Sequence, residues 1–278
     1  MKVLKQFVII YKQTVFYKFE RSKNYEKIRF IRGGGTLTAP KHDSLDSCKV
    51  QCVGPDFVRA FTLAEVLVTL GIIGVVAALT LPSLISHNKT VESVERLKKA
   101  YSVLNQAYKM AELHYGEIEN WDWNLSSKDF FNKYFIPYLN AVKNCENNEG
   151  CWSDDGVIYL LNGNPSEIIK SNQYAKAEIA DGTFIAITNQ QEHAHFYIDT
   201  NGSRRPNTHG KDIFIITLTP KAFIDYAHKV DHKGLWMFGT GLSENELKTN
   251  CKAGKSGAFC PAYLYSNSWI IPKDYPRY

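Results

Sequence analysis

The sequence predicts an α+β protein in which a long N-terminal helix packs, by its second half, on a small antiparallel β-sheet. Three observations lead to this prediction. An uncharged apolar run covers residues 66–85, a stripe of apolar residues with helical spacing continues to about residue 117, and short β-rich segments follow between turns. The chain therefore divides into a leader, an apolar helix, its amphipathic continuation and a globular α+β domain, at residues 1–60, 61–85, 86–117 and 118–278.

The apolar run has the length of a transmembrane helix. Its twenty residues would cover roughly 30 Å at about 1.5 Å per residue, which is the thickness of a hydrocarbon core. Residues 1–60 carry twelve Lys or Arg and five Asp or Glu, so the chain's net charge of +5 leaves −2 for residues 61–278. Basic residues favour the cytoplasmic side of a span, and we expect residues 118–278 on the opposite side. The charge of this part indicates no nucleic-acid partner.

The continuation of the helix is amphipathic. Its apolar stripe recurs every three or four residues and consists of Val91, Val94, Leu97, Tyr101, Leu104, Tyr108, Ala111 and Tyr115. Such a stripe normally faces a core. We interpret the charged residues on the opposite face as solvated and predict one helix from Thr62 to about Glu117.

Short elements are predicted in the globular part. A helix is expected over residues 127–136, with Ser126 or Ser127 as its cap and Pro137 at its end. Strands are expected at 156–161, at 177–180 and 183–188 around a primed turn at Asp181-Gly182, and at 195–199 and 212–217 after a turn at Asn201-Gly202. This sheet would cover the exposed half of the long helix.

Four cysteines lie in the globular part. Cys145 and Cys151, and Cys251 and Cys260, form two pairs that are close in sequence, which suggests local disulfides in an oxidising compartment. Four cysteines allow three pairings, and a zinc site built from all four thiolates is the alternative. Cys48 and Cys52 precede residue 61 and are expected to be reduced, or absent from the mature protein.

Glu65 is a single charge in the outermost turn of the apolar helix. A carboxylate in an apolar environment is costly without a cationic partner. Cleavage between Ala60 and Phe61 would create an α-amine four residues before Glu65, one helical turn away.

The run AFTLAEVLVTLGIIGVVAALTLPSLI, which begins at Ala60, resembles the N-terminal cleavage and methylation motif of type IV prepilins and type II secretion pseudopilins. The resemblance covers about 25 residues. It implies that a prepilin peptidase cuts after Ala60 and methylates Phe61, and that Glu65 guides assembly. Pro82 stands where many members carry a helix-loosening proline. Ala60 replaces the commoner Gly, and we expect this to slow processing.

The resemblance implies a structural subunit of a type IV pilus or a type II secretion pseudopilus. Its implied partners are other pilin or pseudopilin subunits, the prepilin peptidase, the inner-membrane assembly platform and, before assembly, membrane lipid. The implied location is the bacterial inner membrane, crossed once with the C-terminal domain outside, and then a periplasmic pseudopilus or a cell-surface filament. Residues 1–60 are either a genuine leader or partly untranslated, with a start at Val53 or Val58.

Other functions stay open. A minor pilin at the filament tip would bind a surface, DNA or a secretion substrate through residues 229–278, which are rich in aromatic residues. An ordinary membrane anchor or a secretory signal would explain the apolar run alone, although a signal peptide is cut after its apolar core. A membrane-anchored enzyme is the weakest alternative. We find no catalytic motif and expect neither an enzyme nor an organic cofactor.

Two groups of residues suggest metal binding. Asp199, Asn201 and Asp212 offer clustered oxygen atoms, and the resemblance extends to major pseudopilins, which have a calcium-binding C-terminal loop. The alternative is that these residues simply form turns, and Arg204 and Arg205 would oppose a cation if they pointed inward. A strand would place His193 and His195 on one face, as for a transition metal, but we interpret the histidines as scattered surface residues.

Overall fold

The computed structural model describes residues 62–278 except residues 149, 154 and 170–172. Phe61–Tyr278 forms one unit of the chain and is described by itself, and Met1–Ala60 is the other unit. The predicted cleavage residues Ala60 and Phe61, and the predicted leader, lie outside the described residues.

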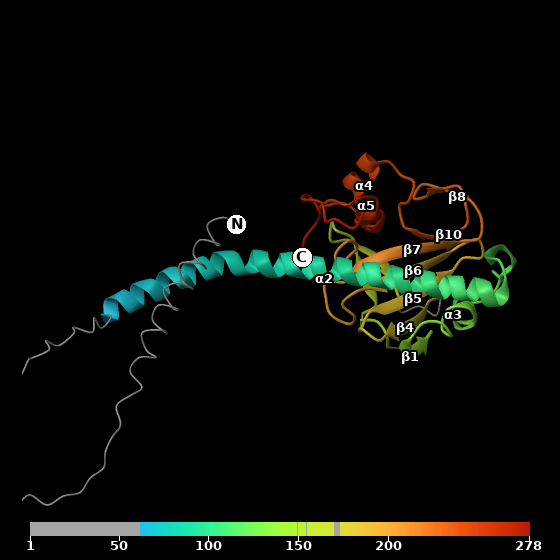
Figure 1. Ribbon diagram of the computed structural model, residues 1–278, viewed down its shortest axis with the longest axis horizontal. Helices are drawn as coiled ribbons and strands as arrows, with labels where there is room; N and C mark the ends of the chain where they lie inside the picture. Colours follow the sequence, from blue (N-terminus) through green and yellow to red (C-terminus); the bar gives the residue numbers. More distant parts are fainter. Residues whose placement is uncertain (1–61, 149, 154, 170–172) are drawn as a thin grey trace, which may run out of the picture. The chain divides into compact units, whose positions relative to one another are not determined.

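The predicted long helix is present as α2 (Leu63–Tyr115), which has 53 residues. It continues through Pro82 without a break and ends at Gly116, whose backbone N–H donates to Glu112 O. Its second half lies against the sheet (Figure 1). The apolar stripe is buried from Val94 to Ala111 except for the partly buried Tyr101, while Val91 and Tyr115 at its two ends are 37% and 39% exposed.

A six-stranded antiparallel sheet forms the centre of the domain. Its strand order is β1-β4-β5-β6-β7-β10. The strands are β1 (Ala141–Glu146), β4 (Ala175–Ile179), β5 (Phe184–Asn189), β6 (Ala194–Asp199), β7 (Ile213–Thr219) and β10 (Gly234–Met237). The predicted α+β layout, with an antiparallel sheet on a long helix, is therefore confirmed, and so are the predicted β4–β5 and β6–β7 pairs.

The turn between β4 and β5 differs from the prediction. Primed two-residue turns need a positive φ angle at the first central residue, here Asp181, and the type I′ turn needs one at the second as well. Only Gly182 has one (φ 81°), and Gly182 N donates to Ile179 O at 2.9 Å. The chain therefore makes an ordinary turn through Ala180 and Asp181 before the glycine. Asp181 stays at the surface, where it pairs with Lys99 at 2.8 Å.

The first face of the sheet packs against α2 and against α3 (Ser127–Tyr134), which Ser126 caps as predicted. The short 3-10 helix η1 (Ile118–Asn120) connects these two helices. Trp121 stacks on Tyr134 with ring centroids 4.3 Å apart, and Phe135 meets Phe196 of β6 at 4.8 Å. These aromatic residues form the core that joins helix and sheet.

The second face of the sheet is also covered. Tyr197 and Ile215 point into a smaller apolar cluster with residues of the connecting segments. Those segments contain β2 (Val157–Tyr159), β3 (Pro165–Ile168), β8 (Phe223–Ile224) and β9 (Lys229–Val230), and two further helices follow, α4 (Glu244–Asn250) and α5 (Cys260–Ser266). The strand predicted at 156–161 is thus shorter than expected and lies outside the main sheet.

Candidate functional site

The first half of α2 exposes its apolar side chains. The large apolar residues from Leu63 to Ile85 are all between 41% and 78% exposed. By length and composition, α2 is the one helix among the described residues that could cross a membrane. A continuous apolar surface of this size needs lipid or another protein to cover it.

Glu65 lies at the start of this exposed surface and takes part in capping the helix. Thr62 Oγ1 accepts from Glu65 N at 3.2 Å, and Glu65 Oε2 accepts from Thr62 N at 2.9 Å. This reciprocal pair is a capping box, which satisfies two of the free N–H groups at the helix start. The Glu65 side chain therefore folds back toward Thr62 at the start of the helix.

Where α2 reaches the domain, polar contacts join it to the loop between β6 and β7. Ser93 Oγ lies 2.7 Å from Thr200 Oγ1 and donates to Lys211 O at 2.5 Å. Ser86 Oγ donates to the main-chain oxygen of the C-terminal residue Tyr278 at 2.6 Å. The loop and the C-terminus thus fix the point at which the helix leaves the domain.

The same loop brings together the three predicted calcium ligands. Asp199 and Asp212 are fully buried, and the Asn201 side-chain amide donates to Asp212 Oδ2 at 2.8 Å. The carboxylate of Asp212 also accepts from the backbone N–H groups of Asn207 and Thr208, at 2.8 and 2.6 Å. Asp212 therefore holds the loop in its conformation.

Three buried side-chain oxygens of Asp199 and the loop that follows it have no hydrogen-bond donor among the described residues. No described residue donates to Asp199 Oδ2, Asn201 Oδ1 or Asn207 Oδ1. Burial, and then the nearby Asp212 carboxylate, raise the pKa of Asp199 well above its ordinary value. Burial raises the pKa of Asp212 to about 6. A bound cation would offset the free-energy cost of burying these carboxylates in their ionised form. Carboxylate and amide oxygens are ligands that suit calcium.

Basic residues surround the entrance to the loop. Arg204 and Arg205 are exposed; Arg204 Nε donates to Asn201 O at 3.1 Å, and Arg205 pairs with Asp155 at 2.6 Å. A pocket of about 100 Å³ reaches Ser93 and Asn201 from solvent, and Lys89, Arg96, Arg204 and Arg205 also line it. Within the described part of the chain, no three His, Cys, Asp or Glu residues are placed to hold a metal. Calcium would therefore need the Asn amides in addition to Asp199. Asn207, whose side-chain oxygen is also buried without a described donor, is not among the predicted ligands, although Pro206-Asn207 belongs to the same polar run.

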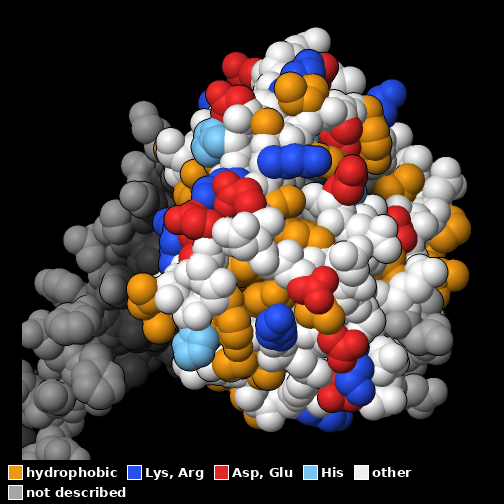
Figure 2. Space-filling model, turned by 90° about the vertical axis from the view of Figure 1, so that its right-hand side faces the viewer, with side chains coloured by type: hydrophobic (Ala, Val, Ile, Leu, Met, Phe, Trp, Pro, Cys, Tyr) orange, Lys and Arg blue, Asp and Glu red, His pale blue; other side chains and the backbone are white. Residues whose placement is uncertain are grey.

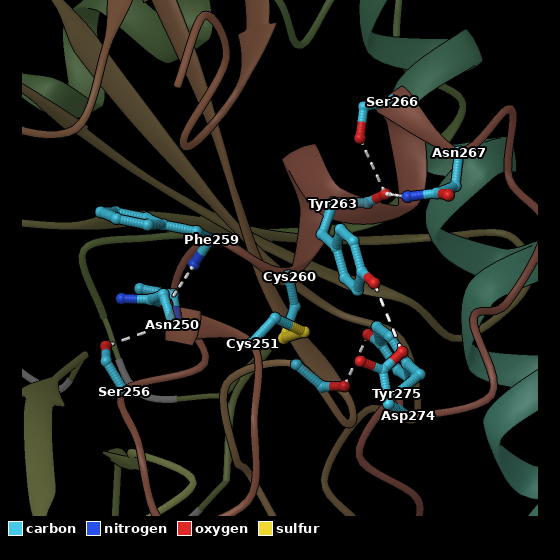
Figure 3. Close-up of a disulfide and its surroundings, with 12 residues drawn as sticks. Asn250, Cys251, Ser256, Phe259, Cys260, Tyr263, Ser266, Asn267, Asp274 and Tyr275 are labelled. Atoms are coloured by element: carbon cyan, nitrogen blue, oxygen red, sulfur yellow. Dashed lines mark hydrogen bonds between the residues drawn. A yellow bond between two sulfur atoms is a disulfide. The ribbon is translucent and has the colours of Figure 1, made fainter. Parts of the chain in front are cut away.

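Two disulfides connect the predicted cysteine pairs, Cys145 with Cys151 and Cys251 with Cys260. The second joins the end of α4 to the start of α5, close to Tyr275 (Figure 3). The Tyr275 hydroxyl donates at 2.7 Å to Gly210 O, in the loop between β6 and β7, which we call the polar loop. A Cβ on Gly210, where φ is 76°, would lie 2.4 Å from Cys260 Sγ, so the disulfide packs directly on the loop.

The interpretation of the histidines as scattered surface residues is wrong for most of those in the sheet domain. His209 and His228 are 1% and 0% exposed, and His193 and His195 are partly buried and 3.2 Å apart between their Nε2 atoms. They gather on the second face of the sheet because β6 and the segments that cover this face converge there. The alternation of His193 and His195 was the only signal for this cluster in the sequence.

The surface at the far end of the domain carries mixed charges. On the face drawn in Figure 2, acidic and basic side chains are interspersed and do not gather in a patch of one sign. Lys233, for example, pairs with both Glu117 and Glu119, the latter at 2.8 Å.

Residues 83–278 match a family of unknown function (DUF6613), and the chain belongs to this family. The match begins one residue after Pro82 and covers the second half of α2 and the whole sheet domain. Neither the curated proteins nor the solved structures contain a match to the chain.

Proposed function

We propose that this protein is a structural subunit of a type IV pilus or a type II secretion pseudopilus, cut by a prepilin peptidase and assembled through the first half of α2. One observation carries the proposal. A single unbroken helix exposes an apolar surface from Leu63 to Ile85 and buries its second half in a sheet domain. Lipid can cover the exposed half before assembly, and identical helices can cover it afterwards.

Details of the exposed half support packing among helices. No described atom lies within 4 Å of a Cβ built on Gly71 or Gly74, so a neighbouring helix could approach closely there. A simple membrane anchor would gain nothing from a carboxylate at Glu65. In a processed subunit, this carboxylate would pair with the new α-amine of Phe61. Because α2 is one continuous helix, the apolar half and the sheet domain would enter a filament together.

Processing gives the first test. We expect intact-mass analysis of the membrane fraction to show a chain that starts at methylated Phe61. Ala60→Gly should be processed faster, because Gly is the residue commoner at this position in the resembling motif. A mature chain that starts elsewhere, or that keeps residues 1–60, would contradict the prepilin hypothesis.

A minor subunit at the filament tip is the second candidate. The C-terminal region exposes large apolar side chains, among them Ile270 (72%) and Tyr265 (45%), although the Tyr265 ring also lies 5.8 Å from that of Tyr101 in α2. A tip protein would use such residues to bind its target. Quantitative mass spectrometry of sheared filaments separates the two roles, because a major subunit is abundant along the filament and a tip protein is scarce.

We further propose that the loop between β6 and β7 binds calcium through Asp199, Asn201 and Asn207, with Asp212 holding the loop in place. Calcium would stabilise the point where α2 leaves the domain, since Thr200 and Lys211 of this loop contact Ser93. We expect chelation with EGTA to lower the melting temperature of the wild type. Asp199→Asn should abolish this calcium dependence, and the exposed Asp231→Asn should keep it. A wild-type melting temperature that calcium does not change would contradict the proposal.

The sign of the pH dependence gives a second readout of the same site. The raised pKa of Asp199 contributes stability that is present below the ordinary pKa and is lost as the pH rises through the raised value. Without calcium, the wild type should therefore lose stability relative to Asp199→Asn as the pH rises from about 4 to 7. With calcium, the bound ion should remove or reverse this difference at neutral pH.

A further inference from the structure

A row of hydrogen-bonded side chains crosses the second face of the sheet. His195 of β6 lies opposite Thr217 of β7 in the strand register, and His195 Nδ1 is 3.0 Å from Thr217 Oγ1. Thr217 Oγ1 is 2.9 Å from His228 Nε2, and His228 Nδ1 is 3.2 Å from Asp225 Oδ1. At the other end of the row, His195 Nε2 meets His193 Nε2 at 3.2 Å.

The carboxylate of Asp225 fixes the direction of every hydrogen bond in this row. An ionised carboxylate only accepts, so His228 must carry its proton on Nδ1 and accept from Thr217 at Nε2. The Thr217 oxygen then accepts from His195 Nδ1–H. Burial lowers the pKa of His195 to about 3 and also lowers that of His228, which favours the neutral form of both rings. His195 Nε2 therefore presents a lone pair toward His193.

We propose that His193 Nε2 and His195 Nε2 chelate a divalent transition-metal ion such as Zn²⁺ or Cu²⁺. Two imidazole nitrogens on one tetrahedral zinc, each at about 2.0–2.1 Å, lie roughly 3.3 Å apart. The observed separation of 3.2 Å therefore needs little change. No described residue hydrogen-bonds His193 Nδ1, so the proton that His193 Nε2 donates to His195 can move to that nitrogen, and the metal would replace this one hydrogen bond.

Thr217 supplies the support that a metal-bound histidine usually has. Such a ligand donates its second ring N–H to an oxygen, which fixes the tautomer and the orientation of the ring. His195 has this arrangement through Thr217, and His228 and Asp225 orient Thr217 in turn. Imidazole is a ligand that zinc and copper favour.

The two histidines line a cavity of about 660 Å³ whose charges favour a cation. Glu167 and Asp225 are in its lining, and the described lining residues include no Lys or Arg. Because no third His, Cys, Asp or Glu in the described part of the chain completes a metal cluster, the ion would keep positions for water or an outside donor. The result is an open, exchangeable site, which does not depend on filament assembly.

Zinc titration of the full-length protein tests this inference. The protein is purified in detergent with its disulfides intact and without chelator, and ZnCl₂ is titrated by calorimetry in excess CaCl₂, so that the loop between β6 and β7 does not contribute. We expect one site with a micromolar dissociation constant. His195→Asn and His193→Asn should each weaken binding at least about tenfold, and Thr217→Val about tenfold or more. His232→Asn, at an exposed histidine outside the row, should bind as the wild type does.

Copper gives an independent readout of the ligands. The electron paramagnetic resonance spectrum of the Cu²⁺-loaded wild type should show coupling to two imidazole nitrogens, and that of His193→Asn to one. Near-UV circular dichroism verifies that each variant is folded, and His193, which is only partly buried, should tolerate substitution. The inference is overturned if the wild type binds no zinc, or if folded His195→Asn binds it equally well.

Discussion

Glu65→Ala is expected to leave the protein processed and membrane-inserted but to exclude it from filaments. Insertion depends on the apolar surface from Leu63 to Ile85, which the substitution does not touch. Assembly would bury the Phe61 amine among apolar helices, and an unpaired buried charge costs about 3–5 kcal/mol. Loss of the capping box with Thr62 costs only about 1 kcal/mol, so the unpaired charge dominates.

Two further variants separate the charge from the cap. Glu65→Gln keeps a side-chain oxygen that can accept from Thr62 N but removes the negative charge. Thr62→Ala keeps the negative charge of Glu65 but removes the hydroxyl oxygen that accepts from Glu65 N. We expect Glu65→Gln to be missing from sheared filaments and Thr62→Ala to be incorporated, as measured by quantitative mass spectrometry against the membrane pool. Normal incorporation of Glu65→Ala, or exclusion of Thr62→Ala alone, would refute charge pairing.

The long helix and the strands joined by clear turn signals were predictable from the sequence, and most of the shortest elements were not. The stripe in α2 extends over enough residues for a period to be recognised, and the segments of β4 to β7 are β-rich and separated by turn residues. β8 and β9 have two residues each, and the strand predicted at 156–161 forms over only the three residues of β2. No period can be recognised in such short segments. They are strands because of their pairing and packing over the second face of the sheet, which a local pattern does not reveal. β1, β3, β10, α4 and α5 were missed as well.

The polar loop between β6 and β7 and the histidine row also differ in how far the sequence predicts them. The polar loop was predictable because Asp199, Asn201 and Asp212 are close in sequence, as well as in space. The histidine row was not, because His195, Thr217 and His228 come from three separate segments. Register places His195 opposite Thr217, and the chain after β8 brings in His228. Only the folded sheet determines that these side chains meet.

Removal of the Cys251–Cys260 disulfide should destabilise the domain more than removal of Cys145–Cys151. The cysteines of the two bonds are nine and six residues apart, and closing loops of this size contributes roughly 2–3 kcal/mol in each case. Chain entropy therefore does not distinguish them. Cys251 and Cys260, however, are 1% and 0% exposed and belong to the main core, to which Cys145 and Cys151 do not contribute.

The expected difference follows from what surrounds Cys260. Replacing both cysteines with alanine removes sulfur atoms that pack against Gly210 of the polar loop. The cavity left behind lowers the free energy of unfolding by about 1–2 kcal/mol, in addition to the stabilisation lost with the cross-link. We expect the Cys251→Ala/Cys260→Ala melting temperature to be lower than that of Cys145→Ala/Cys151→Ala by about 2–4 °C for each added kcal/mol. The variant without Cys251 and Cys260 should also lose part of its response to calcium, because Gly210 and Tyr275 connect the disulfide to the loop. Equal melting temperatures for the two variants would show that the disulfides act through chain entropy alone.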